Sequence, residues 1–67
     1  MRYRLRAERK AAGLTQAQLA ARVGVCQQSL SKHELGTATP RYFSLIRQYE
    51  GELGVPASEL FPDVFSL

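Results

Sequence analysis

The sequence predicts an all-α fold: a compact bundle of five helices in a single domain that spans residues 1–67. Apolar residues recur at the spacing of a buried helix face rather than in alternation. Threonine, a good N-cap residue, precedes two of the apolar stretches, at Thr15 and Thr39. Glycines end the stretches, as they do at helix C-termini, at Gly13, Gly24 and Gly54.

The first helix is expected to run from about Arg2 to Ala12 and to stop at Gly13. Leu5 is its core-facing residue, and Ala12 is a second candidate for the core. The second helix begins after Thr15, because Gln18 three residues later completes a capping box. One of its faces is apolar, with Leu19, Ala20 and Val23.

Gly24 ends the second helix in a tight turn, since glycine tolerates the left-handed conformation. The third helix is anchored by Val25 and Leu30 and ends at Gly36, and this turns its polar side chains outward. Those side chains are Gln27, Gln28, Ser31 and Lys32. Two short helices joined in this way form a helix-turn-helix pattern, which is suited to reading base edges in DNA. A helical hairpin with a merely solvated polar face is the alternative.

Thr39-Pro40 is expected to open the fourth helix, with Thr as N-cap and Pro at the first helical position. This helix extends to Gly54. Val55-Pro56 begins the fifth helix, and two apolar residues then close the core, Leu60 and Phe61.

The net charge of +3 is unevenly distributed along the chain. Residues 1–48 carry all nine Lys and Arg and two of the six acids, which gives +7, whereas residues 49–67 give −4. This asymmetry suits a basic part that faces DNA and an acidic part that faces away. An ordinary solvated surface with uneven charge is the alternative.

Composition also argues against several classes of protein. A single Cys cannot form an internal disulfide, which suits a reducing cytoplasm. No apolar run approaches the roughly 20 residues of a membrane span, and the polar, Arg-rich N-terminus does not resemble a signal peptide. One His, one Cys and six scattered acids form no catalytic pair or metal-ligand spacing. We therefore expect no enzyme, metal, cofactor or membrane partner.

The run GLTQAQLA, then VGV, then QQSLSKHELG, resembles the phage-repressor and Cro-like helix-turn-helix family. The resemblance covers roughly residues 2–61 and implies the lambda-repressor-like bundle, with the helix-turn-helix at its second and third helices. It also implies a DNA-binding transcriptional regulator, a repressor that binds a near-palindromic operator in double-stranded DNA as a homodimer. Such a protein is cytoplasmic, bacterial or phage-encoded, and associated with the nucleoid. The rival hypothesis is a protein-binding module, for example an antitoxin that masks a toxin.

The resemblance places base contacts at Gln27 and Gln28, and their amides can pair with adenine. Ser31 and Lys32 follow as further base readers, although Lys32 also suits a phosphate. Exposed polar filler is the alternative for the two glutamines.

Phosphate contacts are expected at helix N-termini, where unpaired N–H groups favour anions, and one of these is at Cys26. The resemblance implies a further phosphate contact at Gln16. Cys26 is a poor N-cap where Ser or Thr is usual; redox sensing is an alternative use of its thiol. Arg41 matches a residue that enters the minor groove in some members, or it contacts a phosphate. The N-terminal basic residues are expected to add at most non-specific attraction for DNA; they are Arg2, Arg4, Arg6 and Lys10.

Further expectations concern packing. The resemblance implies that Arg9 pairs with Glu34, because family members often carry an Arg–Glu pair at these positions. Glu8, where the family prefers an apolar residue, is expected to lie at an edge beside Arg4 or Lys32. His33, also at an apolar position of the family, is expected to be a half-buried packing group; a pH switch is the alternative.

Two expectations concern the C-terminal third of the chain. The segment from Pro40 to Gly54 is about one residue longer than is usual in the family. Because Gly51 also disfavours a helix by about 1 kcal/mol relative to Ala, we expect an irregularity near it. The apolar tail is predicted to be a dimer contact; a tail folded back on its own core is the alternative. Its contact residues would be Phe61, Val64, Phe65 and Leu67.

Overall fold

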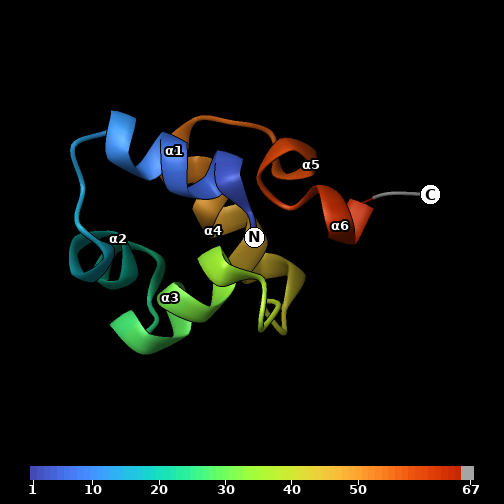
Figure 1. Ribbon diagram of the computed structural model, residues 1–67, viewed down its shortest axis with the longest axis horizontal. Helices are drawn as coiled ribbons and strands as arrows, with labels where there is room; N and C mark the ends of the chain where they lie inside the picture. Colours follow the sequence, from blue (N-terminus) through green and yellow to red (C-terminus); the bar gives the residue numbers. More distant parts are fainter. Residues whose placement is uncertain (66–67) are drawn as a thin grey trace.

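The computed structural model describes residues 1–65, and every regular element in that range is a helix (Figure 1). The all-α prediction is confirmed. The predicted number of helices was one too small, because the chain after Leu60 forms an additional short helix. The helices are α1 (Tyr3–Ala11), α2 (Gln16–Val23), α3 (Gln27–Leu35), α4 (Phe43–Leu53), α5 (Ala57–Leu60) and α6 (Pro62–Phe65).

The start and end of α2 follow the local signals in the sequence. Thr15 Oγ1 accepts a hydrogen bond from the Gln18 backbone N–H (3.1 Å), and Gln18 Oε1 accepts one from the Thr15 N–H (2.9 Å). This is the predicted capping box. Gly24 has a φ of +84°, and its N–H donates to the Ala20 carbonyl. The left-handed glycine therefore ends α2 and turns the chain into α3.

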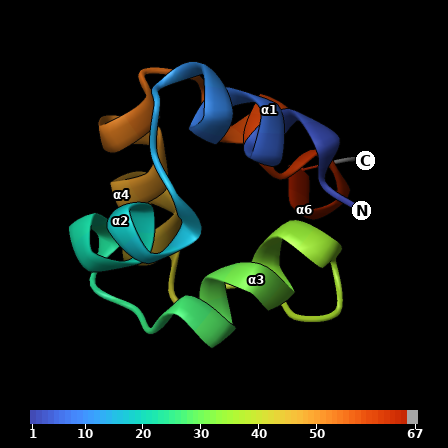
Figure 2. The same ribbon diagram turned by 60° about the vertical axis from the view of Figure 1, so that its left-hand side comes forward.

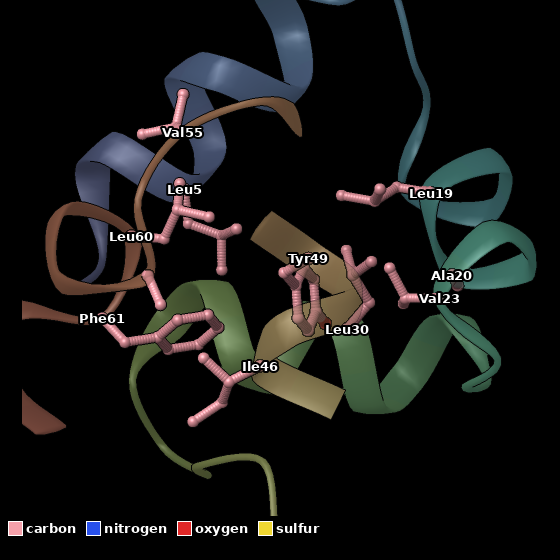
Figure 3. Close-up of a cluster of buried hydrophobic side chains, with 11 residues drawn as sticks. Leu5, Leu19, Ala20, Val23, Leu30, Ile46, Tyr49, Val55, Leu60 and Phe61 are labelled. Atoms are coloured by element: carbon pink, nitrogen blue, oxygen red, sulfur yellow. The ribbon is translucent and has the colours of Figure 1, made fainter. Parts of the chain in front are cut away.

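The core lies between α1 and α5 on one side and α2 on the other, with α4 in the middle and α3 along its lower side (Figure 3). Tyr49 of α4 and Phe61 pack edge to face with ring centroids 5.3 Å apart, and neither is exposed. Such a pair adds about 0.5–1.5 kcal/mol beyond the burial of its surface. The predicted core residue Leu5 is buried, whereas Ala12 is exposed and does not contribute. The buried hydrophobic residues are Leu5, Leu19, Ala20, Val23, Leu30, Ile46, Tyr49, Val55, Ala57, Leu60 and Phe61.

A buried ion pair joins α1 to α3. Arg9 Nε donates to Glu34 Oε2, and Arg9 Nη1 donates to the Leu14 carbonyl (2.8 Å). Their side chains are 9% and 2% exposed, so the predicted pair lies inside the molecule. Glu8 pairs with Arg4 at 2.8 Å, one of the two neighbours expected for it.

The start of α4 differs from the prediction. The helix begins at Phe43 with Tyr42 as its N-cap, three residues after Pro40. Thr39 does not cap it, because its hydroxyl accepts a hydrogen bond from the guanidinium of Arg2 (2.8 Å). The expected irregularity at Gly51 was also wrong: α4 runs through Gly51 to Leu53 without a break. The irregular residues between Pro40 and Gly54 are those that precede the helix.

The apolar tail divides between core and surface. Phe61 was predicted in a dimer contact, but it is fully buried in its own chain and offers no surface to a second copy. Val64 is 39% exposed. Phe65 is half-buried and packs edge to face on the exposed Phe43 of α4, at 5.7 Å between ring centroids. Leu67 lies outside the described residues.

His33 is buried more deeply than predicted, with 5% of its surface exposed. Its Nδ1 lies 2.8 Å from the Tyr49 hydroxyl, and the two groups share a hydrogen bond. Burial, together with the positive charge of Arg2, lowers the pKa of His33 below its usual value. The ring is therefore held neutral between α3 and α4.

We expect the domain to lose stability as the pH falls below about 6.5, the usual pKa of a solvated His. There the unfolded chain takes up a proton on His33 before the folded chain does, so each pH unit costs up to about 1.4 kcal/mol. Urea denaturation at pH 7.5 and pH 5 measures this effect. The variant His33→Gln, which cannot titrate, should lose it, and an equal loss of stability in both proteins would contradict the prediction.

None of the six helices has the length and apolar character that crossing a membrane requires.

Candidate nucleic-acid interface

One long side of α3 faces outward. The helix lies along the lower edge of the molecule in both ribbon views, with the other helices on one side of it (Figures 1 and 2). Leu30, His33 and Glu34 point inward and are buried. Because a helix turns 100° per residue, the residues between these anchors must point away from the core.

The outward side of α3 carries the residues that were predicted to read bases. Gln27, Gln28 and Lys32 are exposed, and Ser31 is partly exposed. Within the described residues, none of these four side chains makes a hydrogen bond to the rest of the protein. Their donors and acceptors are therefore available to a partner.

Sequence reasoning missed Leu35 in this surface. Leu35 is 51% exposed and lines a shallow depression together with Gln28, Ser31 and Lys32. It lies seven residues after Gln28, two helical turns along the same face. This spacing was the signal that could have placed it there.

Ion pairing leaves the uncompensated positive charge around α3. All six acidic side chains pair with Arg, at distances of up to 3.8 Å. In the part of the chain that the structure describes, four cationic side chains have no carboxylate partner: Arg6, Lys10, Lys32 and Arg41.

Two of these cations, Arg6 and Arg41, flank the outward side of α3. Arg6 lines a depression with Ser31 and Leu35, and Lys10 follows one turn later on α1. On the other flank, Arg41 and Lys32 line the same groove between α3 and the chain that leads to α4. A concentration of positive charge around exposed amides is the pattern expected of a nucleic-acid surface.

Gln16, predicted to contact a phosphate, lies in the depression with Arg6 and Ser31. Its Nε2 donates to Glu34 Oε1 at 3.1 Å. An amide nitrogen carries two N–H groups, so one donor remains for a partner.

Cys26 is the N-cap of α3, as predicted, and its side chain does not cap the helix. The thiol is exposed, and its Sγ lies 3.2 Å from Ser29 Oγ. Hydrogen bonding by Ser29 lowers the pKa of this thiol below its usual value. The first N–H groups of α3 are thus left without a side-chain cap at the point where a phosphate contact was predicted.

Arg2 is the residue whose environment differs most from its prediction. It was expected to add at most non-specific attraction for DNA, but only 4% of its surface is exposed, and its guanidinium contacts three separate segments of the chain. Among residues 1–65 no group of three His, Cys, Asp or Glu side chains lies close enough to hold a metal ion.

Comparison with known proteins gives one match. A family model described as helix-turn-helix matches residues 5–60, which extends from α1 to the end of α5. No curated protein and no solved structure matches the chain significantly.

Proposed function

The chain belongs to the phage-repressor and Cro-like helix-turn-helix family, and from that premise we propose that it is a sequence-specific DNA-binding repressor. It acts as a homodimer on a near-palindromic operator, in the cytoplasm of a bacterium and on DNA of the bacterium or of a phage. The outward side of α3 carries the proposal, because exposed amides without protein hydrogen-bond partners lie there with Lys32, between Arg6 and Arg41, and these three cations have no carboxylate partner among the described residues.

In this function α3 enters the major groove. The N-terminal residues of a recognition helix contact base edges, and these are Gln27 and Gln28. A Gln amide donates to N7 and accepts from the N6 amino group of adenine, and each good bidentate pair contributes about 1–3 kcal/mol of discrimination. Ser31 and Lys32 extend the reading surface, and Leu35 adds an apolar side chain suited to the methyl group of thymine.

The unpaired cations and the helix N-termini bind the phosphates. Arg6 and Lys10 serve one flank of α3, and Arg41 serves the other, at the edge of the minor groove or at a phosphate. The uncapped N–H groups after Cys26 and the remaining donor of Gln16 add neutral contacts. These contacts orient α3 without reading sequence.

A second copy of the chain covers the exposed apolar side chains around the start of α4 and α6. Half-site centres one helical turn apart, about 34–36 Å, then suit the two recognition helices of the dimer. The proposed dimer surface consists of Tyr42, Phe43, Val64 and Phe65.

The variant Gln28→Ala is expected to weaken binding to the cognate site by about 1–3 kcal/mol and to relax specificity at one base pair. Binding to random DNA should stay unchanged, because phosphate contacts are untouched. Fluorescence anisotropy with both DNAs measures the difference. An equal loss on the two DNAs would contradict base reading by Gln28.

The salt dependence of binding tests the proposed partner. Each phosphate neutralised on duplex DNA contributes a slope of about −0.9 to log K against log[salt], so the three phosphate-binding cations in each of two copies give about −5. A module whose main partner is another protein, such as an antitoxin, would bind through apolar contacts that salt does not weaken. A slope near zero on duplex DNA would favour that alternative function.

A further inference from the structure

The guanidinium of Arg2 uses all five of its N–H donors, and all of them bind protein groups. Nε and Nη2 donate to the two carboxylate oxygens of Asp63 on α6, at 3.0 and 2.8 Å. Nη1 donates to the carbonyl oxygens of His33 and Ala38, at 2.7 and 2.8 Å. The second N–H of Nη2 reaches the Thr39 hydroxyl at 2.8 Å. A guanidinium has five N–H donors in a fixed plane, so its orientation is completely determined here.

These hydrogen bonds join segments that lie far apart in the sequence. The His33 carbonyl belongs to the last turn of α3, where carbonyls lack partners in their own helix. Ala38 and Thr39 lie in the loop of residues 37–42, which precedes α4. Asp63 is 61 residues from Arg2 in sequence. Because the Arg2 side chain is only 3% exposed and also lies over the Phe61 ring at 5.0 Å, water does not compete well for these bonds.

Apart from its bonds to Arg2, the loop is held at its two ends: the Thr37 and Ala38 N–H groups donate to the Lys32 carbonyl, at 3.1 and 3.4 Å, and the Tyr42 carbonyl accepts from α4. Within residues 1–65, Arg2 supplies the hydrogen bonds to the Ala38 carbonyl and the Thr39 hydroxyl, and residues 40 and 41 make none to protein. Pro40 separates Thr39 from Arg41; it is buried, fixes its own φ and restricts Thr39. Because only the stiff Pro40 separates the two residues, fixing the position of Thr39 also restricts the position of Arg41.

We infer that Arg2 and Asp63 are positioning residues for DNA binding: their ion pair holds the loop of residues 37–42 so that Arg41 faces the same DNA as α3. Neither residue contacts DNA itself. Asp63 orients the guanidinium, and the guanidinium orients the loop. The consequence for DNA rests on the proposed function, whereas the ordering of the loop does not.

The chain offers a matched control for a test of this inference. Asp63→Asn removes one negative charge and one of the two oxygens that accept hydrogen bonds from Arg2, while it keeps the size of the side chain. Glu59→Gln removes the same charge from an exposed pair between the C-terminal region and α1, that of Glu59 with Arg4 at 3.5 Å. The acidic side chains are similarly exposed, 56% for Asp63 and 49% for Glu59. Only Asp63 connects to the loop.

The first measurement uses the DNA-free protein. Backbone ¹⁵N relaxation should show increased motion of residues 37–42 in Asp63→Asn and no change in Glu59→Gln. Thr39→Val, which removes one acceptor of Arg2 but leaves the ion pair intact, should act in the same direction and is independent of the folding of the Asp63 variant. If neither Asp63→Asn nor Thr39→Val increased the motion of residues 37–42, the inference would be overturned, whether or not the protein binds DNA.

The second measurement uses the salt slope on duplex DNA. Arg41→Ala is expected to reduce the slope by about one contact in each of the two copies. Asp63→Asn should reduce it by a similar amount, although its added positive charge would by itself strengthen binding. The double variant should then show no further reduction, because Arg41 is already misplaced. Full additivity of the two changes would overturn the positioning role. Absence of DNA binding in the unaltered protein would refute the proposed function and leave the relaxation result to decide the role of Arg2 and Asp63.

Discussion

Replacing Arg9 with alanine is expected to lower the free energy of unfolding by about 3–5 kcal/mol. The change leaves the carboxylate of Glu34, which is 2% exposed, in the core without its cation, and an unpaired buried charge is strongly destabilising. A domain of this size has only about 3–10 kcal/mol of stability in total. The change should therefore remove a large share of the total stability, and DNA binding should fall with the folded fraction.

Urea denaturation followed by circular dichroism measures this effect. Arg22→Ala is the matched control, because Arg22 pairs with Glu52 on the surface at 3.8 Å and with 56% of its side chain exposed. Exposed pairs contribute about 0–1 kcal/mol. Replacing both partners of the buried pair, as in Arg9→Met with Glu34→Leu, should recover much of the stability, because no lone charge remains. Equal stabilities of Arg9→Ala and the unaltered protein would contradict the account of the pair.

Replacing Phe61 with alanine is expected to cost about 3–5 kcal/mol of folding stability as well. The ring is fully buried, packs against Tyr49 and lies beneath the guanidinium of Arg2. Removing it therefore opens a cavity in the core of each copy. This result would separate the core function of Phe61 from the dimer contact predicted for it.

Val64→Ser is the comparison, because Val64 belongs to the same segment but is 39% exposed. It should leave the unfolding free energy nearly unchanged and weaken self-association in analytical ultracentrifugation. If Phe61→Ala kept its stability and only dissociated the dimer, the buried placement of Phe61 would be wrong. If Val64→Ser left the dimer constant unchanged, the proposed dimer surface would be wrong.

The helix-turn-helix was predictable because its signals are local. The capping box of Thr15 and Gln18 and the left-handed Gly24 are each determined by residues within four positions of one another. The outward direction of Gln28 and Lys32 then follows from helical periodicity alone. Leu35 was predictable from the same periodicity.

The remaining differences arise from contacts between distant residues. Thr39-Pro40 carries a good local signal for a helix start, but Arg2 takes the Thr39 hydroxyl and the helix begins at Phe43. Nothing near Arg2 in the sequence indicates Asp63 as its partner. An apolar tail is equally compatible with a place in the core and with a place in an interface. Only the packing of the whole chain shows that Phe61 lies in the core and Val64 at the surface.

Selection of bound duplexes from a random DNA pool tests the central claim most directly. If α3 reads base edges in a homodimer, the selected sequences should converge on a near-palindrome whose half-site centres are about 10–10.5 base pairs apart. Each half-site should contain adenines that Gln27 and Gln28 can pair with. Retention of the pool without any enriched sequence, or enrichment of unrelated single sites, would contradict the claim that this chain is a dimeric, sequence-specific DNA-binding protein.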